Sequence, residues 1–133
     1  MRKVIELTTL IGNGAISDLI TSSTSTTYLD KLFLGIIPVF SGRYKLSFYC
    51  ETAISLVAQR VFVRIFDGVN IYAEVCPPVK ENYANGQWLP ISGFVILDLT
   101  KNVPFNVALQ FKVSGGTGYI RRARILIERI FIL

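Results

Sequence analysis

The 133-residue sequence contains no histidine. Without histidine, the Ser-His and Cys-His pairs of nucleophilic catalysis are excluded, and so are the usual zinc ligand sets. The nine carboxylates are scattered along the chain, with no spacing typical of a two-carboxylate hydrolase or a calcium loop. We therefore expect a protein that is not an enzyme and that has no metal site and no cofactor.

Cysteine is also scarce, because Cys50 and Cys76 are the only two in the chain. Cys50 continues an apolar strand face, a place that suits a small buried hydrophobic side chain. Buried free thiols are therefore favoured over a disulfide, and the sequence leaves the pairing open.

Long apolar runs are missing. The longest, residues 32–42 (LFLGIIPVFSG), is shorter than the ~18–20 residues of a membrane-spanning helix and is broken by Gly35 and Pro38. The basic start MRK is followed by a brief apolar stretch that Glu6 interrupts, which argues against a signal peptide. We expect no membrane span and synthesis in the cytoplasm without a signal peptide.

Charged residues make up only 17% of the sequence, and the two signs are unevenly placed. Residues 1–100 carry eight basic and eight acidic side chains, which cancel. Residues 101–133 carry six basic side chains against Glu128 alone, and this accounts for the net charge of +5. A partner with negative charge would therefore bind this last segment.

What the sequence has in abundance is period-two alternation of apolar and polar residues, which is typical of half-buried β-strands. It is clearest in residues 43–51 (RYKLSFYCE) and 104–113 (PFNVALQFKV). Asp67-Gly68 between β-branched and aromatic runs predicts a hairpin, and the turn at residues 100–104 predicts a second one. Further strands are expected at residues 3–10 and 31–40.

Seven or eight such strands without a convincing helix predict an all-β fold. We expect an antiparallel two-sheet β-sandwich of about eight strands. One domain covers residues 1–133, and residues 1–27 supply an N-terminal strand plus a Ser/Thr-rich arm. The Ser/Thr tract at residues 17–28 is either a polar surface arm or an edge strand.

The chain ends with residues 115–133, GGTGYIRRARILIERIFIL. A phosphate-binding loop would need a helix start and a Gly-Lys-Ser/Thr ending, and both are absent. The β-branched residues favour a strand, with GGTG as a hairpin turn. A strand that is apolar on both faces needs cover on both, which predicts a subunit interface. The interface residues are Tyr119, Arg121, Arg122, Arg124, Glu128, Ile130 and Ile132.

Within this interface we expect Arg122 and Arg124 to pair with acidic groups such as Glu128 or Asp98. The alternative is a central strand in the core of a monomer, with its arginines at the solvent-facing end. A basic nucleic-acid-binding patch is also open, formed by the arginines and Lys112 beside Tyr119. It is less favoured, because a strand distributes the arginines over both faces.

The one long loop, residues 76–93, collects aromatic and amide side chains. Aromatic faces beside amides suit a carbohydrate site, and Trp88 can alternatively close the end of the core. The candidate ligand-binding residues are Asn82, Tyr83, Asn85, Gln87 and Trp88.

Residues 42–52, 61–75, 93–113 and 116–130, taken together, resemble a small eight-stranded jelly roll. The pattern is similar to the head domains of phage and viral receptor-binding or capsid-associated proteins, and to tumour-necrosis-factor-like domains. This resemblance covers residue 28 to the end and carries no site residue with it. It implies a tight trimer with a structural or attachment role in a virion, with a surface glycan or other virion proteins as partners. A carbohydrate-binding module is the alternative function, and a nucleic-acid-binding β-domain is the third.

Overall fold

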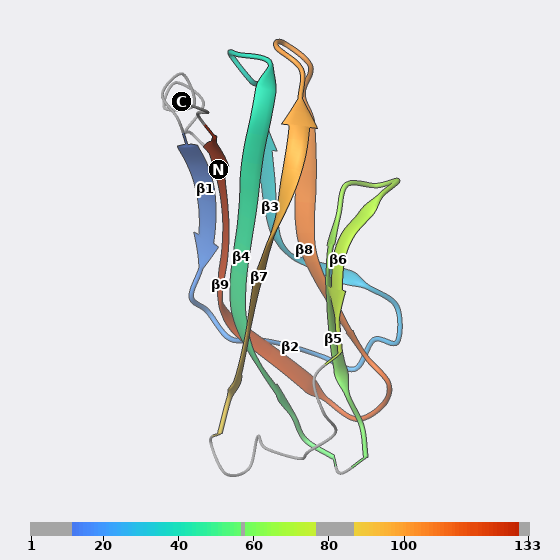
Figure 1. Ribbon diagram of the computed structural model, residues 1–133. Coiled ribbons are helices and arrows are strands. Elements are labelled where there is room, and N and C mark those ends of the chain that lie inside the picture. Colours follow the sequence, from blue (N-terminus) through green and yellow to red (C-terminus); the bar gives the residue numbers. More distant parts are fainter. Residues whose placement is uncertain (1–11, 57, 77–86, 131–133) are drawn as a thin grey trace.

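Two antiparallel sheets pack face to face in the computed structural model (Figure 1), which describes residues 12–56, 58–76 and 87–130. The β4 sheet has the strand order β1 (Gly12–Ser17), β9 (Gly118–Arg129), β4 (Gly42–Ile54) and β7 (Leu89–Leu99), and β2 (Thr21–Ser23) also pairs with β9. The β8 sheet has the order β3 (Leu29–Ile36), β8 (Phe105–Val113), β5 (Val61–Phe66) and β6 (Ile71–Val75).

The strand pairs are nested. β1 pairs with β9, β3 with β8, β4 with β7, and β5 with β6, all antiparallel. Successive pairs alternate between the β4 sheet and the β8 sheet. This arrangement is a jelly roll. The predicted fold class is confirmed, with nine strands in place of about eight and no helix among the described residues.

The N-terminal part differs from expectation in one strand. β1 was not predicted, because Gly-Asn-Gly-Ala lacks alternation and has low strand propensity. Its ladder with β9, from Gly12↔Glu128 to Ser17↔Ala123, holds it in place. The Ser/Thr tract contributes the short edge strand β2, and the strand expected at residues 3–10 lies outside the described residues.

One predicted hairpin is confirmed and two are wrong. β5 and β6 pair across the Asp67 turn, where the N–H of Asp67 donates to the carbonyl of Asn70 at 3.1 Å. The turns at residues 100–104 and 114–117 instead cross between the two sheets. Glycine, proline and asparagine let the chain reverse its direction in these turns. The strand that follows can pair only with a strand that still has an unpaired edge. β8 pairs with β3 and β5, so neither β7 nor β9 pairs with it.

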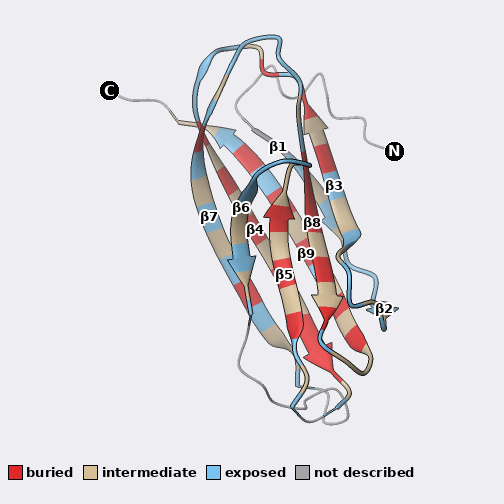
Figure 2. Cartoon of the chain, turned by 90° about the vertical axis from the view of Figure 1, so that its right-hand side faces the viewer, coloured by how far each residue is buried: buried red, intermediate tan, exposed pale blue. Residues whose placement is uncertain are grey.

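The core lies between the sheets, where buried and more exposed residues alternate along the strands of both sheets (Figure 2). Close packing shows at Gly93, which pairs with Phe48: an added Cβ would lie 2.9 Å from Cζ of the ring. Cys50 is fully buried, and burial raises the pKa of its thiol to about 12. The two cysteines form no disulfide, and Cys76 is exposed, so the expectation of two buried thiols is wrong for Cys76. The described residues contain no helix that could span a membrane.

Candidate functional site

β9 contains a β-bulge at Arg121 and Arg122. Tyr49 of β4 pairs with Arg124, but Glu51 pairs with Arg121, so β9 carries one extra residue between these points. Arg122 has a φ of 51°, in the left-handed region where a non-glycine residue is uncommon. Such a bulge locally interrupts the ladder and redirects the side chains beside it.

The bulge reverses which side chains of β9 face the core. Ile120 is buried before the bulge, and Ala123 and Ile125 are buried after it. In a regular strand Ile120 and Leu126 would lie on the same face, but here Ile120 is buried and Leu126 points outward and is 41% exposed. One extra residue shifts the period-two pattern by one position, so apolar residues occupy both faces when the strand is counted without the bulge.

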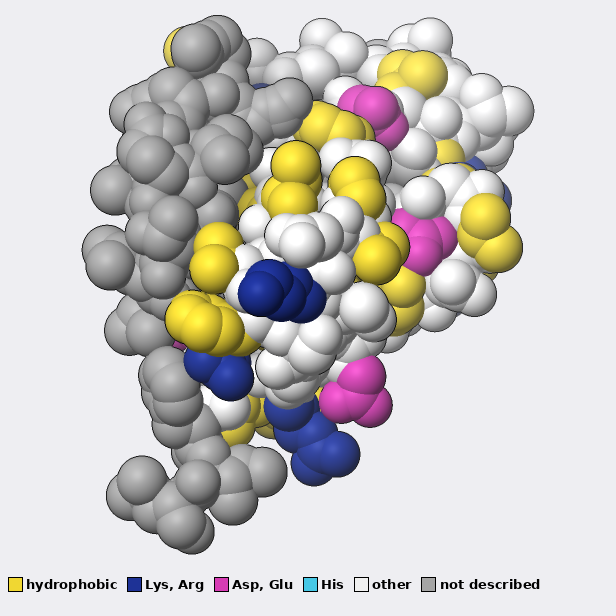
Figure 3. Space-filling view, turned by 90° about the horizontal axis from the view of Figure 1, so that it is seen from above, with side chains coloured by type: hydrophobic (Ala, Val, Ile, Leu, Met, Phe, Trp, Pro, Cys, Tyr) yellow, Lys and Arg dark blue, Asp and Glu magenta, His cyan; other side chains and the backbone are white. Residues whose placement is uncertain are grey.

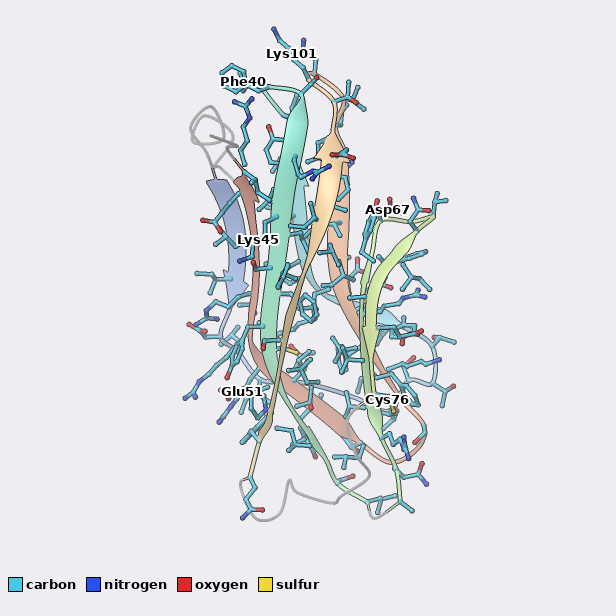
Figure 4. The ribbon with its side chains drawn as sticks, in the orientation of Figure 1. Phe40, Lys45, Glu51, Asp67, Cys76 and Lys101 are labelled. Carbon is cyan, nitrogen blue, oxygen red and sulfur yellow. The ribbon has the colours of Figure 1, made fainter. Side chains whose placement is uncertain are left out.

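Glu51 of β4, labelled in Figure 4, lies opposite the bulge. It forms ion pairs with both arginines. Its carboxylate accepts hydrogen bonds from the Tyr49 hydroxyl at 2.7 Å and from Nε of Arg121 at 2.7 Å, and Nη1 of Arg122 lies at 3.4 Å. The Tyr49 hydroxyl and the two guanidinium groups hold the pKa of Glu51 below its ordinary value. The Arg121 guanidinium lies 4.1 Å over the Trp88 ring. The bulge thus brings two cations to one carboxylate on the outer face of the β4 sheet.

Two other arginines of this face are also paired within the chain. Arg124 binds Asp18 at 2.7 Å, and Arg43 lies 3.6 Å from Asp98. Arg122 and Arg124 therefore have Glu51 and Asp18 as acidic partners, which the sequence analysis did not consider. Alternation alone gave no reason to place Glu51 beside the arginines.

An apolar groove runs along the β1–β9–β4 part of the same outer face. Its volume is about 530 Å³, and Ile16, Tyr49 and Leu126 are among its lining residues. On the other side of β4, Phe94 of β7 is 59% exposed, and Ile96 is also exposed. Exposed apolar patches of this kind mark interaction surfaces. The sequence could have indicated Phe94 and Ile96, because both occupy outward positions of β7, where period-two alternation predicts polar residues.

Apolar side chains also gather at one end of the sandwich (Figure 3). The loops after β3 and after β7 meet there, because the N–H of Asn102 donates to the Pro38 carbonyl at 2.8 Å. Phe40 and Lys101 both project from this end (Figure 4). The Arg129 guanidinium of β9 lies 4.5 Å over the Phe40 ring. We call this surface the loop end.

The predicted ligand-binding loop is only partly described. Asn82, Tyr83 and Asn85 lie outside the described residues, Gln87 is exposed, and Trp88 is half-buried. The half-buried Trp88 ring lies against the Arg121 guanidinium on the outer face of the β4 sheet. The described residues contain no group of three acidic or cysteine side chains that could hold a metal ion.

The predicted interface residues are largely brought together on β9. Arg121, Arg122 and Arg124 point outward beside the groove, and Glu128 is exposed. Tyr119 and Ile130 are half-buried at the two ends of the strand, and Ile132 lies outside the described residues. Residues that the sequence analysis missed on this face are Ile16, Tyr49, Glu51, Phe94 and Ile96.

No protein-family model matches the sequence, and the comparison with curated proteins gave no match. Solved structures match by fold. Eiger TNF from S. frugiperda has a TM-score of 0.55 at 6% identity, covering 93% of this chain and 96% of its own. The PRD1 vertex protein P5 has a TM-score of 0.50 at 13% identity, covering 91% of this chain and 97% of its own.

A mutant VP2 protein of infectious bursal disease virus, from T=1 particles, has a TM-score of 0.59 at 12% identity. The match covers 89% of this chain and 31% of VP2, so this chain spans about a third of that protein. At such identities the likeness is one of fold alone. The expected resemblance to tumour-necrosis-factor-like and viral jelly rolls is confirmed at that level.

Proposed function

We propose that this protein is a non-enzymatic structural or attachment component of a virion that acts as a homotrimer. The observation that carries the proposal is the apolar outer face of the β4 sheet, with its groove of about 530 Å³. Fully burying one Leu, Ile or Phe side chain stabilises by about 1.5–3 kcal/mol. Association through this face would bury several such side chains at once.

The layout of this face favours a ring over a two-fold dimer. Ile16 and Leu126 lie by the groove at the β1–β9 side, whereas Phe94 and Ile96 lie on β7 at the opposite edge. In a closed ring each subunit joins two different patches, one to each neighbour, whereas a two-fold contact uses one patch twice. We infer that Phe94 and Ile96 of one subunit enter the groove of the next. The partly exposed Arg122 would then stand at the polar rim of the contact.

The fold likeness supports a role in a viral particle. One similar structure is a VP2 protein in T=1 particles and another is a vertex protein, so jelly rolls of this kind build shells and vertices. In this chain the loop end, with its exposed Phe40 and neighbouring cations, is the surface we assign to other virion proteins.

The two other candidate functions have less support. Arg121 lies against the Trp88 ring, which reduces the aromatic surface left for a sugar at the predicted loop. Arg121, Arg122 and Arg124 have carboxylate partners in their own chain, which reduces the charge left for nucleic-acid phosphates.

The mass of the protein in solution tests the proposal. Light scattering at micromolar concentration is expected to give three chains of 14.9 kDa, about 45 kDa. A mass of one chain would contradict the oligomer, and a mass of two chains would contradict the ring.

A further inference from the structure

A slot crosses the outer face of the β8 sheet between β3 and β5. Phe33 of β3 and Phe66 of β5 both pair with Ala108 of β8, so the three residues form one row across the sheet. Ala108 is nearly buried, whereas Phe33 is 43% exposed. Two phenylalanines thus stand on either side of a small residue, and the hollow between them has a volume of about 210 Å³. The Arg64 guanidinium lies 4.0 Å over the Phe66 ring, so Phe33 is the more open wall.

The next row along the slot is polar and held in place by hydrogen bonds. Asp30 and Arg64 both pair with Gln110. Nε of Arg64 donates to Oε1 of Gln110 at 2.7 Å, and Nε2 of Gln110 donates to Oδ1 of Asp30 at 2.7 Å. The exposed amide of Asn106 lines the slot on the other side of the phenylalanine row. Hydrogen-bonding groups therefore stand at both ends of an apolar hollow.

The dimensions suit a six-membered sugar ring. Neighbouring strands lie about 4.8 Å apart, so the backbones that carry the two phenylalanines are separated by roughly 9–10 Å. A ring that contacts a wall on each side at about 4 Å needs roughly 8 Å between them. A pyranose has apolar CH groups for the phenylalanines and hydroxyl groups that can both donate and accept. Carboxylate and amide side chains at the rim match these hydroxyl groups.

We propose that the slot between Phe33 and Phe66 binds a pyranose ring of a neutral glycan. A neutral sugar is favoured because two carboxylates, Asp30 and Asp67, line the slot and would repel an acidic one. Asp67 accepts hydrogen bonds from the N–H groups of Val69 and Asn70 and from the Tyr72 hydroxyl, which fixes the hairpin at the rim.

This inference is independent of the proposed assembly, because every slot residue belongs to the β8 sheet of one chain or to its β5–β6 turn. The slot lies on the sheet that does not carry the groove of the β4 sheet. An oligomer built through the β4 sheet would therefore leave every slot open, and a monomer would have it as well.

An NMR titration tests the slot. The ¹⁵N-labelled protein is titrated with the methyl glycosides of glucose, galactose, mannose and N-acetylglucosamine. At least one glycoside is expected to shift the amide signals of Ala108 and Gln110 and to saturate with a dissociation constant of about 1 mM. Phe33→Ala is expected to weaken binding at least tenfold. The matched control Phe94→Ala, which removes an exposed phenylalanine from the β4 sheet, is expected to leave binding unchanged.

Ala108→Leu provides a second variant, because the larger side chain fills the floor of the slot while the walls remain. Circular dichroism and urea unfolding confirm that each variant is folded. The proposal is overturned if no glycoside shifts these signals, or if binding survives both Phe33→Ala and Ala108→Leu. Loss of binding in Trp88→Ala but not in Phe33→Ala would also overturn it and would place the sugar at the predicted loop.

Discussion

The two outer faces of the sandwich are built on the same alternation but present different chemistry. On the β4 sheet, Ile16, Leu126 and Phe94 are exposed beside an apolar groove. On the β8 sheet, aromatic and cationic side chains cover one another: the Arg64 guanidinium lies 4.0 Å from both the Tyr28 and the Phe66 ring. The β4 sheet has such a contact too, because Lys45 lies 4.8 Å over the Phe94 ring, so the faces differ mainly in the size of their hollows, about 530 Å³ on the β4 sheet and about 210 Å³ on the β8 sheet. This difference fits the two proposals, assembly through the β4 sheet and small-ligand binding on the β8 sheet.

A pair of matched charge substitutions tests whether the two outer faces differ in their role in association. Leu126 and Phe33 are 41% and 43% exposed on the two outer faces. Leu126→Glu is expected to weaken association more than 100-fold, because an unpaired carboxylate in an apolar contact costs at least about 3 kcal/mol. Phe33→Glu is expected to leave the mass measured by light scattering unchanged. Equal effects of the two substitutions would remove the distinction between the faces.

A second test compares the charge cluster at the bulge with an exposed ion pair of the same sheet. Glu51→Ala removes the acceptor of Arg121, Arg122 and Tyr49, and leaves two cations side by side. The free energy of unfolding in urea is expected to fall by about 2–3 kcal/mol, because the Glu51 side chain is only 13% exposed.

Asp98→Ala is the control for Glu51→Ala, because it removes an exposed ion pair of the same sheet whose carboxylate is 82% exposed. It is expected to change the free energy of unfolding by less than about 0.5 kcal/mol. If Glu51→Ala were equally mild, the charge cluster at the bulge would contribute little to the folded chain.

The smallest expected effect concerns the Asp67 hairpin at the rim of the slot. Burial alone would raise the pKa of Asp67, but the N–H groups of Asn70 and Val69 and the Tyr72 hydroxyl lower it from 3.8 to about 2. A depressed pKa means that the stabilisation is complete above pH 4 and is lost as the pH falls towards 2. Wild type is expected to lose about 1–2 kcal/mol more than Asp67→Asn over this range in thermal unfolding. Parallel curves for the two proteins would contradict this assignment.

Much of the fold could be predicted from the sequence, because alternation identifies strands wherever a face is buried. It identified β4 and β8, and the β-branched and aromatic runs on both sides of Asp67-Gly68 identified the hairpin of β5 and β6. It could not identify β1, whose Gly-Asn-Gly start follows no alternation and is held by the β9 ladder. Alternation also could not decide whether a turn leads to a strand of the same sheet or of the facing sheet, because that depends on which strands still have an unpaired edge.

The candidate sites were less predictable, because both depend on register. The sequence singled out the arginines of the last strand, but their partner Glu51 is 70 residues away and is placed there by the bulge. Likewise, Phe33, Phe66 and Ala108 are far apart in the chain and meet only because the ladders of β3 and β5 with β8 align them. Neither the composition nor the local residue pattern predicts which distant residues the register brings together.

The bulge of β9 also affects how this chain can be compared with distant relatives. Buried residues occupy even positions up to Ile120 and odd positions from Ala123 onward. An alignment to a regular strand therefore needs a one-residue gap at Arg122. Without that gap, every position after it would be matched to the opposite side of the sheet, and buried positions would be compared with exposed ones.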